Sequence, residues 1–118
     1  MKSKIIKVNS KNLIEIIIDG SKIEKWEDYI KIIGEELDFP ECDRYPTYDG
    51  YSDWMRDLSW IDRSLIIIKI KNYKEFMIKN LKEKEIFLRI AERIVEEWND
   101  LDIRQNSECK TIIFCLVD

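Results

Sequence analysis

Three aspartates recur at every fourth position near the middle of the 118-residue chain: Asp49, Asp53 and Asp57. On a helix that turns about 100° per residue, their carboxylates fall within about 80° of one another. The apolar side chains of this segment fall on the opposite side, and they are Tyr51, Trp54, Met55 and Leu58. The three carboxylates therefore form an outward-facing acidic ladder, which is suited to binding the basic surface of a partner protein.

The same ladder has three other interpretations. It is a solvated helix face if Arg56, three residues after Asp53, neutralises that carboxylate. The dipeptide Asp49-Gly50 is also typical of a hairpin turn. Alternatively, the carboxylates are hard oxygen ligands for magnesium in a small enzyme. Like charges at this spacing destabilise a helix by about 0.2–0.5 kcal/mol per pair. Part of this loss is offset at Asp49, because its negative charge lies at the positive end of the helix dipole.

The composition favours binding over catalysis. The chain has no histidine, 24 acidic and 20 basic residues, and a formal net charge of −4. It therefore lacks the commonest general base and most zinc sites, and its mild acidity suits nucleic acid poorly. Residues 38–63 hold seven acidic and three basic side chains, the whole excess of negative charge. We predict no catalytic residue, no metal and no cofactor, and a basic-surfaced protein rather than nucleic acid as the partner.

The cysteines and the opening segment indicate a cytoplasmic protein. Cys42, Cys109 and Cys115 form no CxxC pair, so we expect reduced thiols that behave as small buried hydrophobes. The opening residues lack the apolar stretch of a signal peptide. No apolar run is long enough to span a membrane, and we expect no membrane partner.

The elements that position the ladder alternate between strands and helices. Three nearly continuous β-type runs, at residues 13–18, 65–70 and 111–117, are typical of parallel strands buried on both faces. Apolar stripes at helical spacing predict four helices between them, over residues 26–37, 51–58, 73–81 and 87–101. Asn72 is the expected N-cap of the third helix.

This order predicts an α/β fold: a small three-stranded, mainly parallel sheet packed with about four helices. We expect one domain over residues 1–118. Residues 1–12 are a candidate for an extra edge strand through Ile5, Ile6 and Val8.

Five runs in the same order give the chain a resemblance to a known family. They are Ile18–Ile23, Glu35–Glu41, Tyr48–Asp53, Met55–Trp60 and Cys109–Leu116. With these runs, residues 13–117 resemble the barstar family of intracellular ribonuclease inhibitors. The specific part of the match consists of Tyr48–Asp53 and Met55–Trp60, because these runs correspond to the second helix of the family and its two aspartates.

The resemblance implies an inhibitor or immunity protein that blocks the active site of a secreted nuclease toxin. In the family, the aspartates of the second helix and the loop before it meet the cationic groups that bind RNA phosphate. By position, that role passes to Asp49 and Asp53. The predicted partner-binding residues are Asp49, Asp53, Asp57, Tyr45, Tyr48, Ser52 and Arg56. We expect the free protein to be a monomer.

Several departures from the family pattern imply a different cognate partner. The loop before the aspartates is one residue longer, with Tyr45 as the candidate aromatic contact, and Ser52 replaces a tryptophan of the family. The family also has an acidic partner contact on its last helix, and the candidates for it here are Glu92, Glu96 and Glu97. The alternative function is an interaction or immunity module for a partner that is not a nuclease. Such a module would use the aromatic side chains of Tyr45, Tyr48, Tyr51 and Trp60.

Overall fold

The computed structural model describes residues 10–40, 47–100 and 110–118. Its strands and α-helices are β1 (Leu13–Asp19), α1 (Trp26–Glu36), α2 (Tyr48–Asp57), β2 (Leu65–Lys71), α3 (Leu81–Asn99) and β3 (Thr111–Leu116). Short 3-10 turns are η1 (Ser10–Asn12), η2 (Gly20–Lys22) and η3 (Tyr73–Glu75). The candidate edge strand through Ile5, Ile6 and Val8 lies outside the described residues, as do Cys42 and Cys109.

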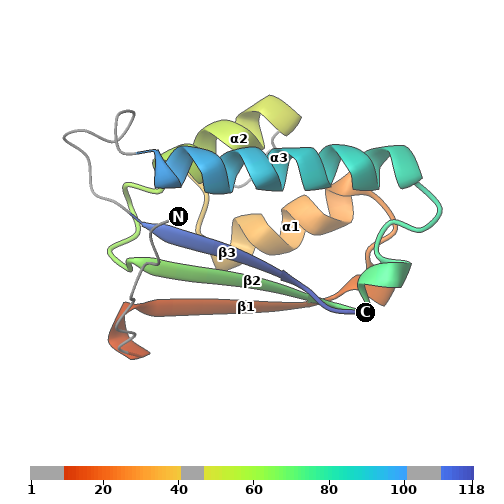
Figure 1. The fold of residues 1–118 in the computed structure, drawn as a ribbon, viewed down its shortest axis with the longest axis horizontal. Coiled ribbons are helices and arrows are strands. Elements are labelled where there is room, and N and C mark those ends of the chain that lie inside the picture. Colours follow the sequence, from red (N-terminus) through yellow and green to blue (C-terminus); the bar gives the residue numbers. More distant parts are fainter. Residues whose placement is uncertain (1–9, 41–46, 101–109) are drawn as a thin grey trace.

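The three strands form one parallel sheet in the order β1-β2-β3. The three α-helices lie on one side of this sheet, with α2 and α3 next to each other (Figure 1). The predicted α/β class and three-stranded parallel sheet are therefore confirmed. No helix in the described ranges is long and apolar enough to cross a membrane.

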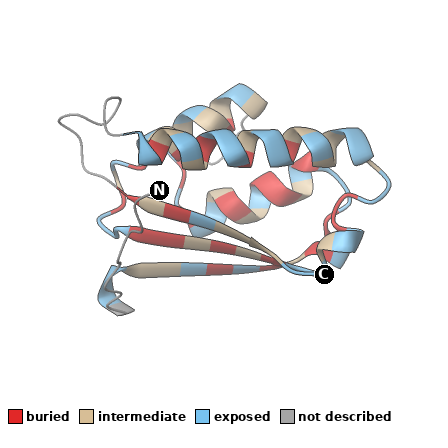
Figure 2. Cartoon of the chain, viewed as in Figure 1, coloured by how far each residue is buried: buried red, intermediate tan, exposed pale blue. Residues whose placement is uncertain are grey.

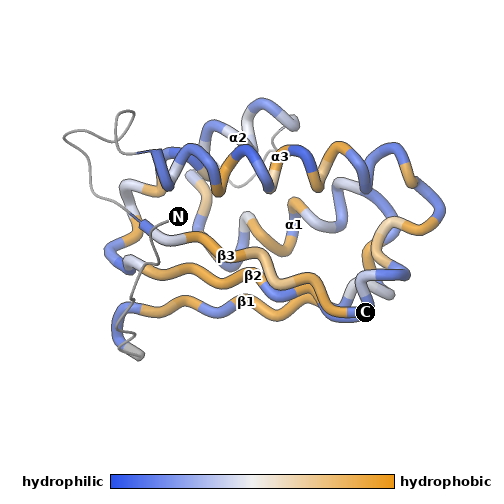
Figure 3. The backbone as a smooth tube through the Cα atoms, in the orientation of Figure 1, coloured by the Kyte–Doolittle hydropathy of each residue, from blue (hydrophilic) through white to orange (hydrophobic). Residues whose placement is uncertain are grey.

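In the described part of the chain, the sheet is buried mainly on the face that the helices cover. In β1, Ile16 and Ile18 point towards the helices and are 3% and 2% exposed, whereas Ile17 between them is 54% exposed. Figure 2 shows buried residues on both the helices and the strands, where they are interspersed with less buried ones, although the strands are apolar along most of their length (Figure 3). The prediction of two buried faces was wrong, because isoleucine also fills positions that no described helix covers. Cys115 is a free, half-buried thiol.

The predicted helix over residues 73–81 is a turn. Before α3 begins at Leu81, only η3 is helical there, and Met77 has a positive φ of 52°, which ends any helix. The backbone N–H of Met77 donates instead to the carbonyl of Ile23 at 2.9 Å. Asn72, the expected N-cap, is the N-cap residue of η3, but it has a positive φ and its side chain makes no capping hydrogen bond. The chain thus has three α-helices in its described part instead of about four, and α3 begins at Leu81, earlier than expected.

An aromatic cluster joins the helices to the core and fixes the position of α2. Tyr29 of α1 and Tyr51 of α2 are fully buried, and their hydroxyl oxygens lie 2.5 Å apart in a hydrogen bond. The ring of Tyr29 makes edge-to-face contacts with Phe76 and Phe87, at 6.1 and 5.0 Å between centroids. Burial raises the pKa of both tyrosine hydroxyls, so the pair stays neutral and bonded.

Buried polar side chains hold the end of α2 and the chain that follows it. The indole Nε1 of Trp98 on α3 donates to the carbonyl of Met55 at 2.7 Å. Lys110, only 1% exposed, donates from Nζ to the carbonyls of Ile61 and Arg63, at 2.5 and 2.9 Å. The last turn of α2 is therefore tied to α3, and the connection between α2 and β2 is tied to the residue before β3.

Candidate partner-binding site

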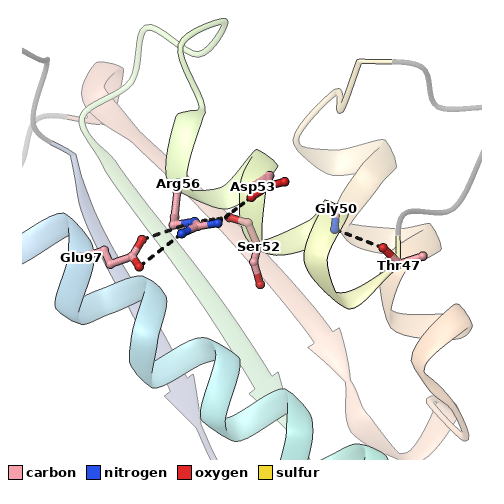
Figure 4. Close-up of polar contacts among 6 residues, drawn as sticks. All are labelled: Thr47, Gly50, Ser52, Asp53, Arg56 and Glu97. Carbon is pink, nitrogen blue, oxygen red and sulfur yellow. Dashed lines mark hydrogen bonds and ion pairs between the residues drawn. The ribbon is translucent and has the colours of Figure 1, made fainter. Parts of the chain in front are cut away.

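The helix that carries the acidic ladder begins earlier than its apolar pattern indicates. Thr47 is its N-cap, and the side-chain oxygen of Thr47 accepts a hydrogen bond from the backbone N–H of Gly50 at 3.2 Å (Figure 4). Asp49 and Gly50 both lie inside α2, so the hairpin-turn interpretation was wrong. Asp49 occupies the first turn, where a negative charge is stabilised by the helix dipole.

The two faces of α2 are separated as the spacing predicts. Tyr51, Met55 and Leu58 are fully buried. The three aspartates of the ladder, Asp49, Asp53 and Asp57, are exposed. The carboxylates are therefore carried by a helix whose opposite face is anchored in the core.

Arg56 links the ladder to α3. Its Nη2 lies 2.5 Å from Oδ1 of Asp53, which confirms the expected pairing. Its Nε and Nη1 also contact the two carboxylate oxygens of Glu97 on α3, each at 3.3 Å, and its Nε donates to the carbonyl of Ser52 (Figure 4). Asp53 stays 71% exposed at its side chain. Arg56 thus orients Asp53 while leaving that carboxylate open to a partner.

Of the three acidic candidates on the last helix, Glu97 is the one that approaches the ladder. It is 22% exposed at its side chain and engaged with Arg56. Glu92 and Glu96 are exposed and line a separate groove between α3 and β3. Sequence spacing alone could not separate these three residues, because it does not show which side of α3 meets α2.

The aromatic residues of the region serve mainly as structural anchors. Tyr48 packs on Trp26, with 4.6 Å between ring centroids. Burial and, after it, the charge and hydrogen bond of Glu83 raise the pKa of the Tyr48 hydroxyl. Trp60 is half-buried and donates to the carbonyl of Leu37 at 2.8 Å. Since Tyr51 is also buried, an exposed aromatic surface is not present among these residues, and Tyr45 lies outside the described part of the chain.

A pocket of about 290 Å³ lies between α2 and α3 beside the ladder. It is lined by Asp49, Ser52 and Arg56 from α2 and by Ile86, Arg89, Ile90 and Arg93 from α3. The two α3 arginines that line this pocket were not predicted from the sequence as site residues. Their spacing of four residues, which places both on one side of a helix, was the available signal.

The carboxylates of the ladder are spread along α2 rather than gathered around a point. In the ranges that the structure describes, no three acidic or cysteine side chains form a group that could hold a metal ion. Magnesium binding by Asp49, Asp53 and Asp57 therefore has no support in the geometry. What the arrangement can do is present fixed charges to another molecule.

A parallel three-stranded sheet, helices on one face and an exposed acidic helix define a small α/β protein. Residues 14–111 match the family described as Barstar (barnase inhibitor), and the chain belongs to this barstar family. No curated protein sequence matches the chain. The family is one of inhibitors rather than enzymes.

Proposed function

We propose that this protein is a cytoplasmic inhibitor or immunity protein that binds a nuclease toxin and blocks its active site with α2. The observation that carries the proposal is the exposed ladder of Asp49, Asp53 and Asp57 on a helix whose other face is buried. Membership of the barstar family supports a ribonuclease as the target.

The physical basis is competition with a polyanion. A nuclease active site must attract phosphates, so it carries cationic groups that fixed carboxylates can also satisfy. Because α2 is anchored by Tyr51 and Met55, little conformational entropy is lost when its carboxylates bind. Opposite charge also accelerates the encounter of the two proteins, which suits a protein that must neutralise a toxin quickly.

Inhibition of RNA cleavage tests the proposal directly. Barnase is the first probe, because the family description names it. The second probe is any nuclease captured by the immobilised chain from an extract of its own cells. We expect one equivalent of the chain to abolish cleavage by at least one of these enzymes. A chain that inhibits neither contradicts the proposal, and a captured partner without nuclease activity favours the alternative of a module for another protein.

Asp53→Ala is expected to weaken binding of the inhibited nuclease at least tenfold, about 1.4 kcal/mol. The reason is that an exposed carboxylate is removed and a cationic group of the partner is left unpaired. Titration of RNA cleavage gives the Kd. The fold should persist, since the exposed pair with Arg56 contributes at most about 1 kcal/mol.

Asp62→Ala is the matched control for this measurement. Asp62 carries the same charge, its side chain is 99% exposed, and it lies outside α2. Its removal should leave the Kd within about twofold, a change below about 0.5 kcal/mol. Equal Kd values for the Asp53 variant and the unmodified chain would exclude α2 as the blocking element.

A further inference from the structure

The surface beside the acidic ladder carries arginine side chains. Arg89 and Arg93 lie one turn apart on α3 and both line the pocket between α2 and α3. The opposite wall of that pocket includes Asp49 and Ser52. A partner that covers α2 would therefore meet carboxylates and guanidinium groups side by side.

The cations of the pocket differ in how far they are already neutralised. Arg56 is shared between Asp53 and Glu97. Arg89 pairs with Glu85 of its own helix at 2.6 Å. Arg93 is exposed and makes no ion pair with any residue in the described ranges. The pocket thus has one guanidinium group that is open to an incoming anion.

On the basis of the proposed function, we propose that this pocket binds an acidic side chain of the nuclease, held by Arg93 and Arg89 next to the cations that meet Asp49 and Asp53. Guanidinium binds a carboxylate through two parallel hydrogen bonds, which fixes both distance and direction. Ile86 and Ile90 line the same pocket and give it an apolar part beside the two guanidinium groups.

The size and charge of the pocket favour one side chain over a free nucleotide. Its volume of about 290 Å³ lies at the lower limit of small-ligand pockets, which span about 300–1,000 Å³. A nucleotide would also bring several negative charges next to Asp49 and the rest of the ladder. The arginines would therefore act as a specificity filter: they favour a nuclease with an acidic group beside its cationic site.

The test uses a charge reversal at Arg93, which changes the affinity in opposite directions under the two possible partner surfaces. If the partner surface were uniformly basic, Arg93→Glu would add an attractive charge and tighten the complex. If the pocket receives a carboxylate, the same change replaces attraction with repulsion. We expect Arg93→Glu to raise the Kd at least tenfold for the nuclease that the unmodified chain inhibits, with Arg93→Gln raising it less.

Lys79→Glu is the control with the same change in charge. Lys79 is exposed in the turn before α3, and it lies outside both α2 and the pocket. The Kd of the Lys79→Glu variant for the nuclease should therefore change less than threefold. Thermal unfolding of each variant checks that the fold persists. An unchanged or lower Kd for Arg93→Glu overturns the inference, while loss of binding in Asp53→Ala would still support the proposed function. If the unmodified chain inhibits no nuclease, both fail together.

Discussion

Asp19 shows how one side chain joins the ends of two strands. Its Oδ1 accepts hydrogen bonds from Nδ2 of Asn72 at 3.0 Å and from both the backbone N–H and the hydroxyl of Ser21, at 3.0 and 2.7 Å. Asp19 ends β1, and Asn72 follows β2 directly. The bond from Asn72 first, and those from Ser21 next, lower the pKa of Asp19 to about 2 from a usual 3.8.

This shift predicts a loss of stability in acid. The pKa is lower in the folded chain than in the unfolded chain, so the carboxylate stabilises the fold above pH 3.8. That contribution is lost as the pH falls from 3.8 towards 2. We expect the difference in unfolding free energy between the unmodified chain and Asp19→Asn to shrink over this range. Urea denaturation between pH 2 and 7 measures it, and a difference that is independent of pH would contradict the assignment.

Gly20 and Gly34 illustrate how the same residue type can have opposite roles in two elements. Gly20 begins η2 where the chain passes close to the end of β2. A Cβ at this position would lie 2.7 Å from the carbonyl oxygen of Lys71 and 2.8 Å from that of Asn72. Gly34 lies inside α1, and a Cβ there would meet only Phe39, at 3.8 Å.

Alanine at these two glycines should therefore change stability in opposite directions. Gly20→Ala must move backbone atoms, and we expect it to lower the unfolding free energy by about 2 kcal/mol or more. Gly34→Ala removes an unfavourable residue from a helix interior and should raise it by about 0.5–1 kcal/mol. Urea denaturation of the pair provides the measurement. An unfolding free energy that Gly20→Ala leaves unchanged or raises would show that the close approach at Gly20 is not what restrains this position.

The elements that follow from local pattern were predictable, and those that depend on tertiary contacts were not. The three strands and α1 were found because apolar spacing alone marks them. The turn after β2 was missed because Met77 bonds to Ile23, far away in the sequence. The pocket was missed because it needs α3 beside α2. The contact that shows this placement, between Arg56 and Glu97, joins residues 41 positions apart.

At the scale of the whole molecule, the one-sided sheet is the feature that departs most from the apolar pattern. Ile17 and Ile18 are neighbours in β1, yet they are 54% and 2% exposed. Ile113 of β3, on the same face as Ile17, is 40% exposed. Equal hydrophobicity along a strand therefore does not give equal contributions to stability.

Threonine substitutions at these neighbours should separate the two faces. Ile18→Thr leaves a cavity and buries a hydroxyl among apolar side chains, so we expect a loss of about 2–4 kcal/mol. Ile17→Thr keeps a β-branched residue at a half-exposed position and should change the unfolding free energy by less than about 1 kcal/mol. Thermal or urea unfolding measures both. A large loss at Ile17 would mean that this face is covered when the protein is in solution.

The strand order has a consequence for the speed of folding. β2 is the centre of the sheet, and its Leu65 pairs with Leu13 on one side and Thr111 on the other, partners 52 and 46 residues away. Each edge strand must therefore close a long loop before it gains any of its hydrogen bonds, and such non-local pairing slows folding. Under the proposed function, the protein must meet a toxin as soon as the toxin is made, so the time needed to assemble the sheet would set a lower limit on how early protection begins.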